Sequence, residues 1–240
     1  MKNEQVNIAI ITYDKAHRKT QDTITKLLIR GYCNLTVIAI PWKERKNFLP
    51  LFSHRPSICE DVQLDTMCKN LSIDCEKMKV EELCNYFSKE QFKHILIAGA
   101  GLLPDELVLS HNIINSHPGY LPYSKGLDAF KWAVYNGMPL GATVHYVTNT
   151  PDEGTLIHQE MINVEFTDTF HSVASRLYEL EVKLLVDSID LLEGGLLAKT
   201  SLSDANYSAT RRMPHRIEIA MMARFEQMRL RSRNENQEIG

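Results

Sequence analysis

Three side chains suited to the addition of an amine to a carbonyl group stand near one another in the sequence. Asn115 and His117 lie two residues apart at the end of a short apolar run, and Asp152 follows in a later turn. Because alternate residues of a strand point to the same side, we expect the amide and the imidazole to share one face. The amide can stabilise an oxyanion, while the imidazole and the carboxylate handle the protons of the amine. Asn115, His117 and Asp152 are therefore predicted as the catalytic residues.

The neighbouring residues support this arrangement, although each side chain taken alone has a structural alternative. Pro118 restricts His117 to extended conformations, and a nearby carboxylate would fix the tautomer of the imidazole and raise its pKa. A histidine at a strand end is often structural, and an aspartate close to a glycine is often a turn former. We interpret a further histidine, His145, as packed beneath the site. The ordered set is more specific than any one of its members.

The first half of the chain alternates short apolar runs with segments of helical spacing. Runs typical of buried parallel strands lie at 6–12, 35–40, 94–98 and 113–114. Helices are predicted between them, at 19–30, 67–71 and 80–87. Repeated strand–helix–strand units predict an α/β fold with a mostly parallel sheet flanked by helices. Ligands of such sheets bind outside the carboxyl ends of the strands, where Asn115 stands.

The second half changes pattern and ends in a polar tail. A helix is predicted at 127–135, strands at 142–147 and 155–164, and a long amphipathic helix at 169–192, which Gly194 and Gly195 end. We predict a main domain at 1–195 and a small C-terminal extension at 196–240, made of a loop and a helix at 216–231. The helix carries apolar residues and several arginines. Docking on the domain or on a second subunit is favoured for it over RNA binding.

Composition excludes several classes of protein. The chain has 240 residues, a formal net charge of −3 and 44% hydrophobic residues, so it lacks a broad nucleic-acid footprint and can bury a sizeable core. No run resembles a signal peptide or a membrane span, and we expect a cytoplasmic protein that binds neither nucleic acid nor membrane. A zinc site would have to recruit Cys68, Cys75 and His94 at irregular spacing, so neither metal nor disulfides are expected.

The ordered motifs resemble a known superfamily. The run N-S-H-P-G-Y-L-P from Asn115, then G-L-D-A, G-A-T-V-H-Y-V and D-E-G from Asp152, is similar to the catalytic core of the folate-dependent formyltransferases. The resemblance implies a Rossmann-like formyltransferase fold, the same three catalytic residues, and N10-formyltetrahydrofolate as cosubstrate. It places the pterin between Leu102 and Leu103 on one side and the loop from Val147 through Pro151 to Asp152 on the other.

Three classes of amine acceptor compete within this superfamily. Enzymes that formylate glycinamide ribonucleotide carry a glycine-rich phosphate-binding turn after the first strand, whereas residues 12–18 of this chain contain no glycine. Enzymes that formylate methionyl-tRNA carry a sizeable C-terminal β-domain, which the short tail does not resemble. The best resemblance is to bacterial enzymes that formylate amino-dideoxy sugars linked to UDP or dTDP during the synthesis of surface glycans.

Five residues are candidates for contact with such a sugar nucleotide. They are Tyr120, Lys125, Trp132, Lys15 and Arg211. Lys125 would offset the charge of the pyrophosphate, whereas Trp132 is as compatible with packing of its own helix. Other acceptors stay open: an amino acid, a carrier-bound peptide or glycinamide ribonucleotide. A formyltetrahydrofolate hydrolase or a binding protein without turnover is a further alternative. The sugar, its base, the position of the amine and the oligomeric state, including a possible homodimer, are not determined by the sequence.

Overall fold

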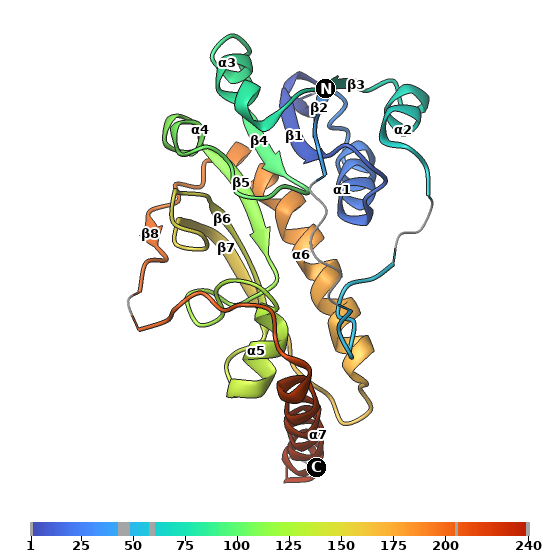
Figure 1. The fold of residues 1–240 in the computed structure, drawn as a ribbon, viewed down its shortest axis with the longest axis vertical. Helices are drawn as coiled ribbons and strands as arrows, with labels where there is room; N and C mark the ends of the chain where they lie inside the picture. The colour runs from blue at the N-terminus through green and yellow to red at the C-terminus, as the bar shows by residue number, and fades with distance from the viewer. Residues whose placement is uncertain (1, 43–48, 58–60, 205, 239–240) are drawn as a thin grey trace.

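A computed structural model of the chain describes residues 2–42, 49–57, 61–204 and 206–238. Within these residues it contains an eight-stranded sheet in the order β3-β2-β1-β4-β5-β6-β7-β8 (Figure 1). The five neighbouring strands β3, β2, β1, β4 and β5 pair in parallel. Strands β6, β7 and β8 follow β5, each paired antiparallel with the strand before it. The strands are β1 (Ile8–Tyr13), β2 (Leu35–Ile40), β3 (Asp74–Lys77), β4 (His94–Ile97), β5 (Ile113–His117), β6 (Gly141–Tyr146), β7 (Thr155–Met161) and β8 (Thr200–Ser201).

Helices cover both faces of the sheet, as expected for the α/β fold. They are α1 (Arg18–Ile29), α2 (Leu64–Asn70), α3 (Leu83–Phe87), α4 (Asp105–Ser110), α5 (Ala129–Asn136), α6 (Phe170–Glu193) and α7 (His215–Glu238), with 3-10 segments at Lys2–Gln5 and Val80–Glu82. Alternate residues of β1 enter different cores, since Ile10 packs with α1, α2 and α6, whereas Ile11 packs with α3 and α4. Both faces of the parallel strands are therefore buried.

Most predicted elements are confirmed, and three others were not predicted. Strand β3 has the sequence DCEK at the edge of the sheet and is mostly exposed, so it carries no apolar signal. Helix α4 has six residues and β8 has two. Such short segments offer too few positions to establish a period.

The C-terminal extension is docked on the main domain and shares its core. Met213, Met221 and Phe225 are fully buried in the larger hydrophobic cluster, and β8 adds to the sheet beside β7. A buried ion pair between Lys131 of α5 and Glu218 of α7 joins the two parts. The described residues of the extension thus share the core of the main domain. None of the helices in the described residues is long and apolar enough to cross a membrane.

Candidate active site

Strand β5 carries two of the predicted catalytic residues to the carboxyl end of the parallel sheet. Asn115 pairs in register with His145 of β6 and Ile97 of β4, and His117 pairs with Thr143. Asn115 is half-buried and His117 is 6% exposed. Since the two residues alternate with Ser116, their side chains leave the strand on the same side.

The loop between β6 and β7 brings the third residue to the same place. Asp152 has a φ of 60°, a left-handed conformation that aspartate tolerates better than most residues. Gly154 closes the turn, because a Cβ atom there would lie 1.6 Å from the carbonyl oxygen of Tyr146. Asp152 Oδ1 stands 3.4 Å from Nδ1 of His117. The structure thus joins the imidazole and the carboxylate, although 35 residues separate them in sequence.

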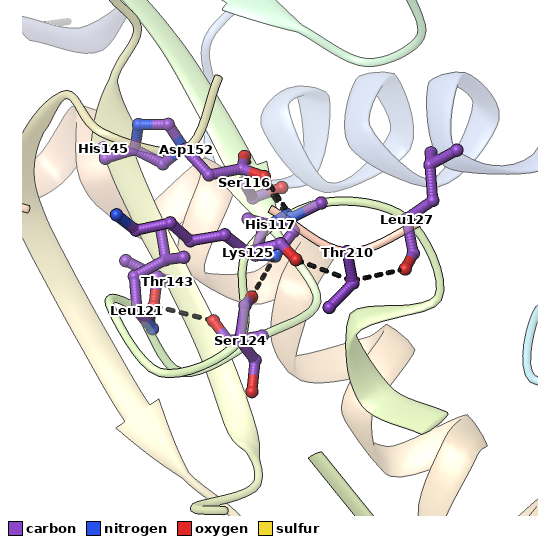
Figure 2. Close-up of polar contacts among 12 residues, drawn as sticks. Ser116, His117, Leu121, Ser124, Lys125, Leu127, Thr143, His145, Asp152 and Thr210 are labelled. Atoms are coloured by element: carbon purple, nitrogen blue, oxygen red, sulfur yellow. Dashed lines mark hydrogen bonds and ion pairs between the residues drawn. The ribbon is translucent and has the colours of Figure 1, made fainter. Parts of the chain in front are cut away.

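The loop after β5 holds both of these side chains (Figure 2). His117 Nε2 lies 2.7 Å from the carbonyl oxygen of Ser124, so this nitrogen carries the donated proton. Nδ1 is thereby the ring nitrogen that faces Asp152. The backbone N–H of Gly126 donates to Asp152 Oδ2 at 2.7 Å. The loop is itself fixed by Thr143 Oγ1, which accepts from the N–H of Leu121 and donates to the carbonyl of Gly119.

His145 lies beneath the site, as the sequence suggested. Its Nδ1 donates to the carbonyl of Tyr146 at 3.0 Å, and its buried Nε2 has no hydrogen-bond partner within the described part of the chain. Burial lowers its pKa to about 4, against a smaller opposing effect of the Asp152 carboxylate. The imidazole is therefore neutral near pH 7 and adds no charge to the site.

A buried charge cluster stands behind the catalytic strand and was not found from the sequence. Lys19 Nζ donates to the carbonyl oxygen of Ser116 at 3.1 Å and to Glu181 Oε1 at 2.8 Å. Arg55 pairs with the other oxygen of Glu181. Burial alone would raise the pKa of Glu181, but Arg55 and Lys19 lower it to about 2. One available signal was that Glu181 shares the buried stripe of its helix with Leu177.

The same edge of the sheet is electropositive next to the start of α1. His17 precedes the helix, and burial, followed by the charges of Lys19, Arg55 and Lys15, lowers its pKa to about 4. His17 is therefore neutral near pH 7, chiefly because its imidazole is buried and secondly because cationic side chains lie nearby. Such an edge favours anions, and α1 presents its amino end there.

Lys125, predicted to contact the pyrophosphate, lies inside the protein and is paired there. Its side chain is only 1% exposed, and Nζ donates to Glu153 Oε1 at 2.8 Å and to the carbonyl of Asp204 at 3.1 Å. These partners come from the Asp152 turn and from the tail, so the ammonium links segments of the protein instead of facing a pyrophosphate. Trp132 likewise packs on the core, and its Nε1 donates to the carbonyl of Arg211 at 2.7 Å.

Two of the other predicted ligand contacts pack on aromatic rings. Lys15 Nζ sits 4.0 Å from the ring centroid of Trp42, and the Tyr120 ring stacks on Tyr123 with centroids 6.2 Å apart. The side chain of Arg211 is exposed.

The apolar residues expected around the pterin fall into two groups. Leu103 and Val147 both pack at the margin of the smaller hydrophobic cluster. Leu102 is 82% exposed, and Pro151 is exposed as well. A cavity of about 670 Å³ lies away from these residues and from the catalytic trio, between residues 51–53, the start of α6 and α7.

Comparisons with known proteins agree with this arrangement. A model of the formyl transferase family matches residues 59–189, more than half of the chain. The dTDP-4-amino-4,6-dideoxyglucose formyltransferase of Mycobacterium bovis is 29% identical over 104 residues, which cover 43% of this chain and 44% of that protein. The phosphoribosylglycinamide formyltransferase of Bacillus subtilis is 38% identical over 105 residues, or 41% and 54% of the two chains. The chain thus spans about half the length of the curated relatives it matches.

A solved structure extends the likeness of the fold to nearly the whole chain. A sugar N-formyltransferase from Shewanella superposes with a TM-score of 0.61 at 16% identity, covering 92% of this chain and 87% of that one. At this identity the likeness concerns the fold and leaves the acceptor open.

Proposed function

The chain belongs to the formyl transferase family, and from this premise we propose that it transfers the formyl group of N10-formyltetrahydrofolate to the amine of a nucleotide-linked amino sugar. The observation that carries the proposal is the contact of His117 Nδ1 with the Asp152 carboxylate at 3.4 Å, on the same strand end as Asn115. An amide donor, an imidazole and a carboxylate meet there, as acyl transfer to an amine requires.

Each of the three catalytic residues has its own role in the proposed reaction. The bound folate supplies an activated formyl group. Asn115 donates a hydrogen bond to the formyl oxygen as negative charge develops on it. His117 is anchored through Nε2 to the Ser124 carbonyl, so only Nδ1 is free to exchange a proton on the side of Asp152. Asp152, held by the Gly126 N–H, keeps the imidazole oriented and stabilises its protonated form.

The residues assigned to the pterin offer apolar surface to a ligand. Leu103 and Val147 are half-buried against the smaller hydrophobic cluster, and Leu102 is 82% exposed. Exposed apolar side chains of this kind favour a flat apolar ligand. We assign these residues and Pro151 to the pterin side.

The nucleotide sugar would enter on the electropositive side. Arg55 is partly exposed, and together with Lys19 and the amino end of α1 it favours a phosphate-bearing acceptor. Lys15, Tyr120 and Arg211 remain candidates for the same ligand, whereas the Lys125 ammonium is buried and paired with Glu153. The Mycobacterium relative, whose name specifies a dTDP-linked amino sugar, supports this class.

Glycinamide ribonucleotide is the second candidate acceptor. The Bacillus relative is more identical in sequence than the Mycobacterium one, over a region of similar length. A ribonucleotide monophosphate would also find cations at the start of α1. Against it, residues 12–18 lack the glycines of a phosphate-binding turn.

Mass spectrometry separates these possibilities. The protein is incubated with N10-formyltetrahydrofolate and, in turn, dTDP- and UDP-linked amino-dideoxy sugars, glycinamide ribonucleotide, or buffer alone. We expect the mass gain of one formyl group on an amino sugar. Formylation of glycinamide ribonucleotide alone would overturn the acceptor class, and release of formate without any amine would indicate a hydrolase.

The same assay tests the catalytic residues. Asn115→Ala and His117→Asn should each lower kcat by about 100-fold or more, because an oxyanion donor or a positioned base is lost. Asn112→Ala, at an exposed position just before β5, is the matched control and should retain full activity. Folded variants of Asn115 and His117 with near wild-type kcat would remove these residues from the mechanism.

A further inference from the structure

A segment of the C-terminal extension lies against the loop that holds His117 and Asp152. We call residues 206–213 the strap. Thr210 in the strap forms a parallel bridge with Gly126 of the loop, through Thr210 N–H to the Lys125 carbonyl and Leu127 N–H to the Thr210 carbonyl, both at 2.9 Å. The Thr210 hydroxyl lies 2.8 Å from the carbonyl oxygens of Lys125 and Leu127 (Figure 2).

The contact is close enough to require glycine in the loop. Gly126 has a φ of 87°, and a Cβ atom on it would lie 2.4 Å from the carbonyl oxygen of Thr210 and 2.5 Å from its nitrogen. The loop and the strap thus touch through their backbones. Any shift of Thr210 must be accommodated by Gly126 and its neighbours.

Further contacts fix the strap at several points along its length. Trp132 Nε1 donates to the Arg211 carbonyl at 2.7 Å, and the Met213 N–H donates to Asp128 Oδ2 at 2.9 Å. The ring of Tyr207 packs edge-on against Tyr123 of the loop, with centroids 5.0 Å apart. Just before the strap, the Asp204 carbonyl accepts from the buried ammonium of Lys125.

The strap contacts residues 124–127 of the loop, and this segment hydrogen-bonds to His117 and Asp152. Ser124 accepts from His117 Nε2 and the Gly126 N–H donates to Asp152, so two backbone groups two residues apart set both side chains. We propose that the strap is part of the active site and that Thr210 is a positioning residue, which acts on His117 and Asp152 through residues 124–127. Lys125 acts in the same way, because its ammonium joins the loop to Glu153, the neighbour of Asp152.

Imidazole NMR on the full chain tests this proposal directly. Thr210→Val keeps the shape of the side chain and removes its hydroxyl. We expect the His117 Nε2–H to exchange with water about 3- to 10-fold faster, as the loss of one hydrogen bond predicts. Thr210→Ser should restore the wild-type exchange rate, and Ser208→Ala, at an exposed strap position, is the matched control.

Kinetics give a second readout, which rests on the proposed function, whereas the NMR readout does not. In Thr210→Val, kcat should fall about 3- to 10-fold with the KM of the formyl donor nearly unchanged, and Thr210→Ser should restore it. If Thr210→Val does not fold, Trp132→Phe removes the bond to Arg211 while keeping an aromatic ring in place. Wild-type His117 exchange in the folded variants would overturn the proposal. Altered exchange in a chain without formyl transfer would uphold the strap and reject the function.

Discussion

Two buried lysine–glutamate pairs occupy different regions of the molecule and do different work. Lys19 of α1 pairs with Glu181 of α6 behind the catalytic strand, whereas Lys131 of α5 pairs with Glu218 of α7 where the tail docks. Each glutamate also contacts the segment 51–55, since Glu181 pairs with Arg55 and Glu218 accepts a hydrogen bond from the Leu51 N–H.

The difference lies in the remaining hydrogen bonds of the lysines. Lys19 has a second acceptor, the carbonyl of Ser116, which stands between Asn115 and His117. Lys131 is 0% exposed, and its ammonium forms an ion pair with Glu218 across the junction of α5 and α7. The same pair of residue types therefore bears on the geometry of catalysis in one region and on docking of the tail in the other.

The largest effect should come from breaking the pair at the tail. Lys131→Met leaves Glu218 buried without its cation, which should lower the free energy of unfolding by about 3–5 kcal/mol. Chemical denaturation measures this change, and exposed Lys69→Met is the matched control. We expect kcat per folded molecule to stay within about twofold of wild type, since the Lys131 ammonium contacts no part of the loop. A loss of less than about 1 kcal/mol would contradict the assignment.

The Lys19–Glu181 pair behind the catalytic strand should make the stability of the fold depend on pH. The pKa of Glu181 is about 2 in the folded protein and 4.5 in a model peptide, so its ionised form stabilises the fold above pH 4.5. This contribution, up to about 3 kcal/mol, is lost as the pH falls from 4.5 towards 2. Glu181→Gln should therefore be destabilised near pH 7, and its difference from wild type should shrink below about pH 4.5. Exposed Glu179→Gln on the same helix should show no such trend, and a difference independent of pH would reject the assignment.

The smallest expected effect is a fall in kcat when the Lys19–Glu181 pair is broken, which distinguishes it from the Lys131–Glu218 pair. Lys19→Met removes the donor to the Ser116 carbonyl, and kcat should fall roughly 10-fold, as expected for one charge-assisted hydrogen bond. Exposed Lys26→Met on the same helix is the control. Steady-state kinetics on the folded fraction provides the measurement. An unchanged kcat would mean that both pairs are structural and that Lys19 does not bear on catalysis.

The sequence predicted best those features whose signal is local. The buried runs of β1, β2 and β4 are apolar throughout or nearly so, and Asn115, His117 and Pro118 stand together in one motif. Strand β3 escaped because an exposed edge strand needs no apolar residues, and β8 because two residues carry no period.

Two charged residues depend on partners far away in the chain. Lys125 was predicted to meet a pyrophosphate, yet its partners Glu153 and Asp204 lie 28 and 79 residues later. Glu181 was not singled out from the sequence, and it is buried where α6 packs against α1. Charge alone does not distinguish a ligand-binding lysine from a cross-link, because the distinction is made by tertiary contacts.

The strap also has a consequence for the order in which the protein matures. A chain leaves the ribosome with its N-terminus first, and domains begin to fold as they emerge. Asn115, His117 and Asp152 are synthesised well before Thr210, and the strap is itself anchored where the Met213 N–H donates to Asp128. A nascent chain can therefore contain all three catalytic side chains while the loop that supports them still lacks its contacts with the strap. Competence for catalysis is therefore the last property to emerge, and it depends on residues outside the catalytic trio.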